Sequence, residues 1–177
     1  MRLSLARKII VEGIKKNVAQ TLTKPITFHL EGDMGIGKTA LARQIAKDLG
    51  FYLVIVSLPQ LEPTDVGGMR MPQGDKMIVL QPDWYVDAEQ MAKLKAEGYK
   101  GVLYFFDELP QSPVLNMNIF AQIADEYRIG DYVLDRSDCY VMSAGNKLSN
   151  KAGTNAMPTH LIDRLTFLEI EPNLDDT

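Results

Sequence analysis

The sequence has few of the residues that hold small scaffolds together or ligate soft metals. Its 177 residues include one cysteine, two histidines and one tryptophan. A single cysteine excludes an internal disulfide and leaves a cysteine-based zinc site without its other ligands. Because Cys139 begins an apolar run, we expect a buried thiol there. His29 and His160 show no metal-ligand spacing, so we expect structural or solvated side chains.

Long apolar runs and an excess of positive charge are also missing. No stretch approaches the roughly 20 apolar residues of a membrane span, and the N-terminus lacks the order of charged, apolar and small residues found in signal peptides. The net charge of −4 gives no general attraction to nucleic acid, although a local basic patch is compatible with it. With 46% hydrophobic residues, the chain is predicted to form one globular domain. We expect it in the cytoplasm, with neither membrane nor nucleic acid as partner.

A glycine-rich segment organises the chain. Residues 32–39 fit the phosphate-binding pattern G-x-x-x-x-G-K-[ST], and the alternative is a chance match in a turn. A β-branched and aromatic run at residues 26–30 predicts a strand before the loop, and apolar spacing over residues 40–49 predicts a helix after it. Glycines let backbone N–H groups turn toward an anion, Lys38 supplies positive charge and Thr39 can ligate magnesium. We therefore predict nucleotide binding by Gly32, Asp33, Met34, Gly35, Ile36, Gly37, Lys38, Thr39 and Ala40.

Further strands and helices are predicted to alternate along the chain. Strands are expected at residues 51–57, 102–106, 139–144 and 165–170, and helices at 3–22, 87–97 and 113–126. This order favours an α/β fold with a parallel sheet. The apolar run at 51–57 predicts a strand buried on both faces. The first helix either lies over an adenine or simply packs in the core.

A segment rich in proline and glycine interrupts the pattern between residues 58 and 85. Residues 76–80 form one short strand candidate, so we expect an insertion with a hairpin, either functional or a solvated loop. Trp84 and Tyr85 are expected to anchor it to the body of the domain. A second short hairpin is predicted around Gly130, and residues 147–157 are expected to be a loop.

Two acidic residues follow the strand predicted at 102–106. Ligands of open parallel sheets bind at the carboxyl ends of the strands, where Asp107 and Glu108 are expected to lie. Asp107 can anchor a magnesium ion together with Thr39, and Glu108 can orient or deprotonate an attacking water. The alternative is an ordinary strand end, since acids are common in loops.

Two polar residues further along are additional candidates. Asn146 follows a strand, where its amide can contact both a γ-phosphate and the attacking water, or it is a turn former. Arg164 either pairs with Asp163 or reaches the nucleotide of a neighbouring molecule.

Taken in order, these motifs resemble the AAA+ ATPases, and within them the MoxR-like group. Residues 32–39 correspond to Walker A, 102–108 to Walker B, Asn146 to sensor 1 and Arg164 to the arginine finger. Residues 61–68 and 76–83 resemble the insertion of that group, and residues 128–130 resemble its hairpin before sensor 1. The resemblance covers nearly the whole chain.

The resemblance implies a fold and a chemistry. The fold is a P-loop NTPase three-layer sandwich with a five-stranded parallel sheet in the order 5-1-4-3-2 and a small β-hairpin insertion. The activity is hydrolysis of ATP with Mg²⁺, in ring oligomers, usually hexamers, that remodel or activate a client protein. The implied catalytic residues are Lys38, Glu108, Asn146 and Arg164, with Thr39 and Asp107 holding the metal. We expect one core domain over residues 1–177, with its insertion at about 58–86. The family pattern continues into a helical lid, whereas this sequence ends seven residues after Ile170, so we expect no lid.

Three functions are compatible with these residues. The first is an ATP-hydrolysing motor module that acts on a partner protein. The second is an interaction module in which nucleotide only stabilises one conformation. The third is a relative that uses GTP, because the chain has no base-reading motif that excludes it.

Overall fold

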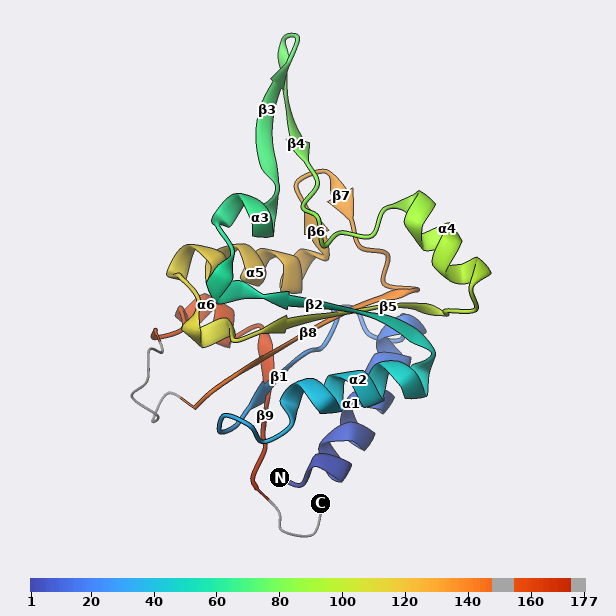
Figure 1. Ribbon diagram of the computed structural model, residues 1–177, viewed down its shortest axis with the longest axis vertical. Helices are drawn as coiled ribbons and strands as arrows, with labels where there is room; N and C mark the ends of the chain where they lie inside the picture. The colour runs from blue at the N-terminus through green and yellow to red at the C-terminus, as the bar shows by residue number, and fades with distance from the viewer. Residues whose placement is uncertain (148–154, 173–177) are drawn as a thin grey trace.

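The structure is a computed structural model that describes residues 1–147 and 155–172. Within these residues, five parallel strands form a central sheet in the order β2-β5-β8-β1-β9 (Figure 1). Numbered along the chain, this is the order 5-1-4-3-2, so the predicted fold is confirmed. The strands are β1 (Thr27–Glu31), β2 (Phe51–Ser57), β5 (Gly101–Asp107), β8 (Cys139–Gly145) and β9 (Leu165–Glu169).

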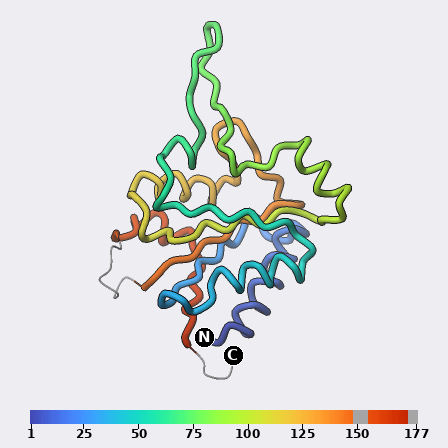
Figure 2. Tube along the Cα trace, viewed as in Figure 1, coloured from blue at the N-terminus to red at the C-terminus, as the bar shows by residue number. Residues whose placement is uncertain are grey.

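Helices cover both faces of the sheet. On one face, α1 (Leu3–Val18) and α2 (Lys38–Leu49) pack against alternate strand residues such as Leu103 and Phe105. On the other face, α5 (Val114–Glu126) packs against the intervening residues, Tyr104 and Phe106. Figure 2 shows the same three layers along the chain trace. Two cores thus form because successive side chains of a strand point to opposite faces.

Shorter elements complete the architecture. They include α4 (Ala88–Ala96), which opens with a capping box of Asp87 and Gln90, and α6 (Thr159–Ile162). Two 3₁₀ turns, η1 (Leu58–Gln60) and η2 (Leu109–Gln111), follow β2 and β5. Cys139 is buried as expected, and burial raises the pKa of its thiol. No helix in the described part of the chain is both long and apolar enough to cross a bilayer.

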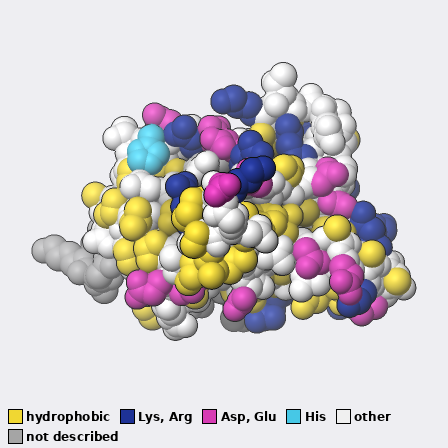
Figure 3. Space-filling view, turned by 90° about the horizontal axis from the view of Figure 1, so that it is seen from above, with side chains coloured by type: hydrophobic (Ala, Val, Ile, Leu, Met, Phe, Trp, Pro, Cys, Tyr) yellow, Lys and Arg dark blue, Asp and Glu magenta, His cyan; other side chains and the backbone are white. Residues whose placement is uncertain are grey.

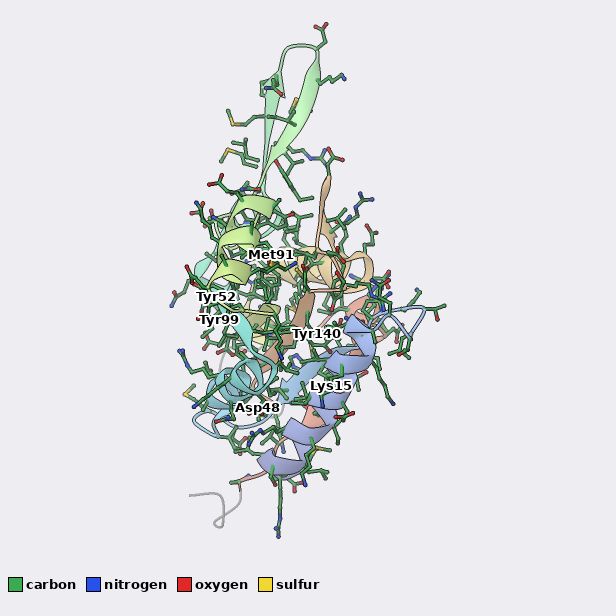
Figure 4. The ribbon with its side chains drawn as sticks, turned by 90° about the vertical axis from the view of Figure 1, so that its right-hand side faces the viewer. Lys15, Asp48, Tyr52, Met91, Tyr99 and Tyr140 are labelled. Atoms are coloured by element: carbon green, nitrogen blue, oxygen red, sulfur yellow. The ribbon has the colours of Figure 1, made fainter. Side chains whose placement is uncertain are left out.

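The prediction that strand 51–57 is buried on both faces was wrong. This strand, β2, lies at the edge of the sheet, and the side chains of Tyr52 and Ile55 are 40% and 38% exposed. Tyr52 packs edge-to-face on Tyr99 on the outside of the molecule (Figure 4). An apolar run alone does not distinguish a central strand from an edge strand.

The end of the first helix also needed correction. Helix α1 ends at Val18 instead of residue 22, and Gln20 adopts a left-handed φ of 53° just beyond it. Ile10 and Ile14 are fully buried in this helix, which confirms core packing. On α5, Leu115 is 55% exposed and lies outside the buried face of that helix.

The insertion forms a hairpin that projects from the body of the molecule (Figure 1). It consists of α3 (Pro63–Gly67) followed by β3 (Met69–Gln73) and β4 (Lys76–Leu80), of which α3 and β3 were not predicted. Trp84 anchors its base as expected, donating to the carbonyl of Val66 and packing edge-to-face on Phe106. The second predicted hairpin is also present, as β6 (Arg128–Ile129) and β7 (Tyr132–Val133).

Candidate functional site

The glycine-rich loop lies between β1 and α2, as predicted. Gly35 and Gly37 have φ values of 78° and 98°, which residues with a Cβ rarely adopt. Helix α2 begins at Lys38 without a side-chain cap, so N–H groups of its first turn are available to an anion. Beside the loop is a hollow of about 270 Å³, lined by Met34, Gly35, Ile36, Gly37, Lys38, Thr39, Ala40, Asp107, Glu108 and Asn146.

The ammonium group of Lys38 is held inside the loop. Its Nζ donates to the carbonyl oxygens of Gly32 (2.7 Å) and Asp33 (2.9 Å) and to Oδ1 of Asn146 (3.2 Å). Desolvation lowers the pKa of Lys38, while the charge of Asp107 opposes that shift. A partly desolvated cation at a helix N-terminus is an environment that favours phosphate.

His29 in the centre of β1 has a structural role. Its Nδ1 lies 2.9 Å from the hydroxyl of Ser143 on β8, and its ring packs edge-to-face on Phe167. Complete burial, with a smaller contribution from the charge of Lys38, lowers the pKa of His29 to about 3. The imidazole therefore stays neutral at neutral pH, in keeping with the structural reading of this residue.

Thr39 and Asp107 meet at the carboxyl end of the sheet. The Thr39 hydroxyl donates to Oδ2 of Asp107 across 3.0 Å, although the two residues come from different elements, α2 and β5. A hydroxyl and a carboxylate are oxygen ligands of the kind that Mg²⁺ prefers, and both line the hollow beside Lys38. These residues therefore fit a magnesium ion bound together with substrate phosphates.

Glu108 is held in an unusual backbone conformation. Its φ of 59° lies in the left-handed region, which is uncommon for residues other than glycine and concentrates at functional sites. Its N–H donates to Oδ1 of Asp107 (2.9 Å), and its Oε2 accepts a hydrogen bond from the hydroxyl of Ser57 (3.3 Å). The two acids are thus oriented by each other and by the neighbouring strand.

Ser57 and Gln111 were missed by sequence reasoning. Ser57 ends β2 directly beside Asp107 in the strand register, so a polar residue at the end of a neighbouring strand was the available signal. The side-chain amide of Gln111 is oriented so that its nitrogen donates to the carbonyl of Glu108 (3.2 Å). Its oxygen then accepts a hydrogen bond from the backbone N–H of Asn146 (3.3 Å). It therefore links the acidic pair to the predicted sensor residue, and nothing in its local sequence indicates this.

Arg164 lies outside this cluster. Its Nε is 3.3 Å from Oδ2 of Asp125 on α5, and its guanidinium also donates to the carbonyl of His160. The local alternative of a pair with Asp163 was therefore wrong, because α5 brings Asp125 close. Part of the loop predicted at 147–157 lies outside the described residues.

Gly145 allows the close approach that positions Asn146. A Cβ at Gly145 would lie 2.1 Å from Cδ of Pro110, at the point where β8 meets η2. We expect Gly145→Ala to lower the free energy of unfolding by about 1–3 kcal/mol, because the rigid proline ring cannot yield. Urea denaturation measures this loss. Adding Pro110→Ala should restore part of it, and strictly additive effects of the two changes would contradict the proposed contact.

The comparisons agree with this geometry. Residues 28–110, which include the glycine-rich loop and both acids, match the model of the AAA family, described as the ATPase family associated with various cellular activities. No curated protein matches the chain. Among solved structures, it is similar to a presumed ATPase from Cytophaga hutchinsonii ATCC 33406, with 20% identity, a TM-score of 0.58, and coverage of 98% of this chain and 47% of that one. It is also similar to a single-residue mutant of RuvB from Thermotoga maritima, with 16% identity, a TM-score of 0.56, and coverage of 97% and 46%.

These similarities establish the fold of the chain. It spans about half the length of the two solved structures that it matches. The chain thus has the P-loop NTPase fold, and its residues 28–110 resemble the AAA ATPases in sequence.

Proposed function

We propose that the chain is an AAA+ module that binds ATP and hydrolyses it with Mg²⁺. The observation that carries this proposal is the 3.0 Å contact of Thr39 with Asp107, next to Lys38 in one hollow. The loop of residues 32–40 would hold the phosphates through its backbone N–H groups and Lys38. Thr39 and Asp107 would hold Mg²⁺, which when bound neutralises phosphate charge. A nucleotide site is thus supported by charge, geometry and the family match.

Glu108 and Asn146 would perform the remaining steps. Glu108 is the candidate base that orients and deprotonates the attacking water, and Ser57 restrains it until substrate is bound. Asn146 shares a hydrogen bond with Lys38, so its amide lies where a terminal phosphate would arrive. The preference of this site for ATP over GTP is part of the proposal, and nucleotide competition decides it.

Within the AAA+ ATPases, we assign the chain to the MoxR-like group and to the cytoplasm. In this proposal it assembles into hexameric rings and remodels a partner protein. The projecting β3–β4 hairpin supports it, since it occupies the place of the insertion in that group. A head-to-tail interface with a closing rotation forms a ring, and an arginine supplied by a neighbour makes hydrolysis depend on assembly. Arg164 is our candidate for that arginine, within a core domain that we assign to residues 1–177.

The proposal is tested by measuring ATP turnover per chain over a wide range of protein concentrations. Nucleotide binding is checked in the same samples. Turnover is expected to rise with concentration and to fall by about 10³-fold in Arg164→Ala, the range found for arginine fingers. Asp125→Ala is the matched control, because it removes the same ion pair within one chain. We expect it to retain most of the activity.

The outcomes are distinct. Equal losses in both variants would show that Arg164 serves only its pair with Asp125. Tight binding without turnover at any concentration would favour the module in which nucleotide only stabilises a conformation. A chain that binds no nucleotide would contradict the central proposal.

A further inference from the structure

A second hollow lies between the two hairpins and α5. It has a volume of about 550 Å³, and its described lining includes Arg70 from β3, Arg128 from β6, and Ile119 and Gln122 from α5. We call it the basic hollow. It shares no lining residue with the hollow beside the glycine-rich loop, so the function proposed above does not account for it.

The hairpins that form this hollow are fixed to one another. The Tyr132 hydroxyl donates to the carbonyl of Val79 across 2.7 Å, which ties β7 to β4. Gly130 also approaches Val79 so closely that a Cβ would lie 3.1 Å from its side chain. At the base of the projecting hairpin, a Cβ added to Gly67 of α3 would lie equally close to the side chain of Ile119 of α5. The hollow is therefore built by direct contacts between four elements.

The strand register places Arg70 on the side of the hairpin that faces β6 and β7. Arg70 is paired with Val79, and directly opposed residues of an antiparallel pair have their side chains on the same face. Since the Val79 side chain faces Gly130, Arg70 lies on that face too. Arg128 borders the hollow from the neighbouring hairpin, so two arginines line one site.

The charges of this site are uncompensated. Arg7 and Arg164 pair with Asp48 and Asp125, whereas no ion pair involves Arg70 or Arg128 within residues 1–147 and 155–172. The described lining of the basic hollow contains no acidic residue, although the chain has 23 acidic and 19 basic residues. Guanidinium groups bind carboxylates through two parallel hydrogen bonds, so the site is complementary to acidic side chains.

The floor of the hollow is apolar. Val79, Ile119 and Ile123 line it, and the face of the molecule that carries the hairpin shows hydrophobic side chains with both basic and acidic side chains around them (Figure 3). Nucleic acid backbones are bound through rows of cations, whereas here two arginines flank apolar side chains in a chain of net charge −4. We infer that the basic hollow docks a peptide segment of a partner protein in which acidic residues alternate with apolar ones.

The experiment measures fluorescence anisotropy of a labelled short peptide that alternates glutamate with leucine, titrated with the full chain in the absence of nucleotide. We expect binding to the wild type, and weakening by about tenfold or more in Arg70→Glu and in Arg128→Glu, because a like charge replaces the guanidinium. Arg43→Glu, an exposed change on α2 away from the basic hollow, is the matched control and should bind normally. Circular dichroism of all variants checks that they are folded.

Two further probes separate the alternatives. A peptide with glutamine in place of glutamate should bind at least about tenfold more weakly, since it lacks the charge. A single-stranded oligonucleotide that binds better than the acidic peptide would overturn the proposal in favour of a nucleic acid surface. Failure of the acidic peptide to bind, or equal binding by wild type and both arginine variants, would overturn it as well. Because no nucleotide is present, these results are independent of whether the chain hydrolyses ATP.

Discussion

Glu108→Gln should bind ATP as the wild type does and hydrolyse it about 10²–10⁴-fold more slowly, the usual contribution of a general base. Glutamine has the shape of glutamate, so the left-handed backbone at this position and the hydrogen bond from Ser57 need not change. It cannot accept the proton of an attacking water at neutral pH. The change therefore removes the base and leaves Lys38, Thr39 and Asp107 in place to bind nucleotide and metal.

Single-turnover hydrolysis and equilibrium nucleotide binding, measured on the same preparation, separate the two effects. Glu97→Gln is the matched control, because Glu97 is exposed at the end of α4, and it should leave both quantities unchanged. Persistent multi-turnover hydrolysis by Glu108→Gln would show that another group activates the water. Loss of binding together with hydrolysis would instead show that Glu108 helps to hold the nucleotide.

The parts of the site that were predicted from sequence are those determined locally. The glycine-rich loop, its strand and its helix occupy one continuous stretch, so residue spacing predicts them. Asp107 ends one buried strand and Asn146 directly follows another, and the parallel order of the strands places both residues at one edge of the sheet. Thr39 and Asp107 therefore meet as expected although they are far apart in the chain.

What was missed depends on contacts across the fold. Ser57 and Gln111 matter because of neighbours on other elements, and local spacing does not indicate those neighbours. The partner of Arg164 is Asp125 on α5, not the adjacent Asp163, because packing of α5 determines the pair. Strand β3 contains Pro72, which argues against a strand, yet a two-stranded hairpin consists only of edge strands, where proline is tolerated.

Lys38→Ala should weaken the binding of ATP by about 10²-fold or more and abolish hydrolysis with it. At an effective dielectric constant of ~20, a unit charge about 4 Å from another contributes roughly 4 kcal/mol, whereas a tenfold change in affinity corresponds to about 1.4 kcal/mol. Part of that energy is offset, because Nζ must leave the carbonyls of Gly32 and Asp33 and the amide of Asn146 in order to meet a phosphate. The net loss is therefore nearer two orders of magnitude than three.

Isothermal titration with a non-hydrolysable ATP analogue measures this loss, and Lys47→Ala is its control. Lys47 lies in the last turn of the same helix, is exposed, and is remote from the helix N-terminus that faces the hollow. Removing it changes the net charge by the same amount, so any general electrostatic effect on ATP appears in both variants. If Lys38→Ala and Lys47→Ala lose the same affinity for the ATP analogue, the glycine-rich loop makes no specific contribution to binding. If only Lys38→Ala does, the phosphates bind at the N-terminus of α2, and the roles of Thr39, Asp107 and Glu108 can be tested there.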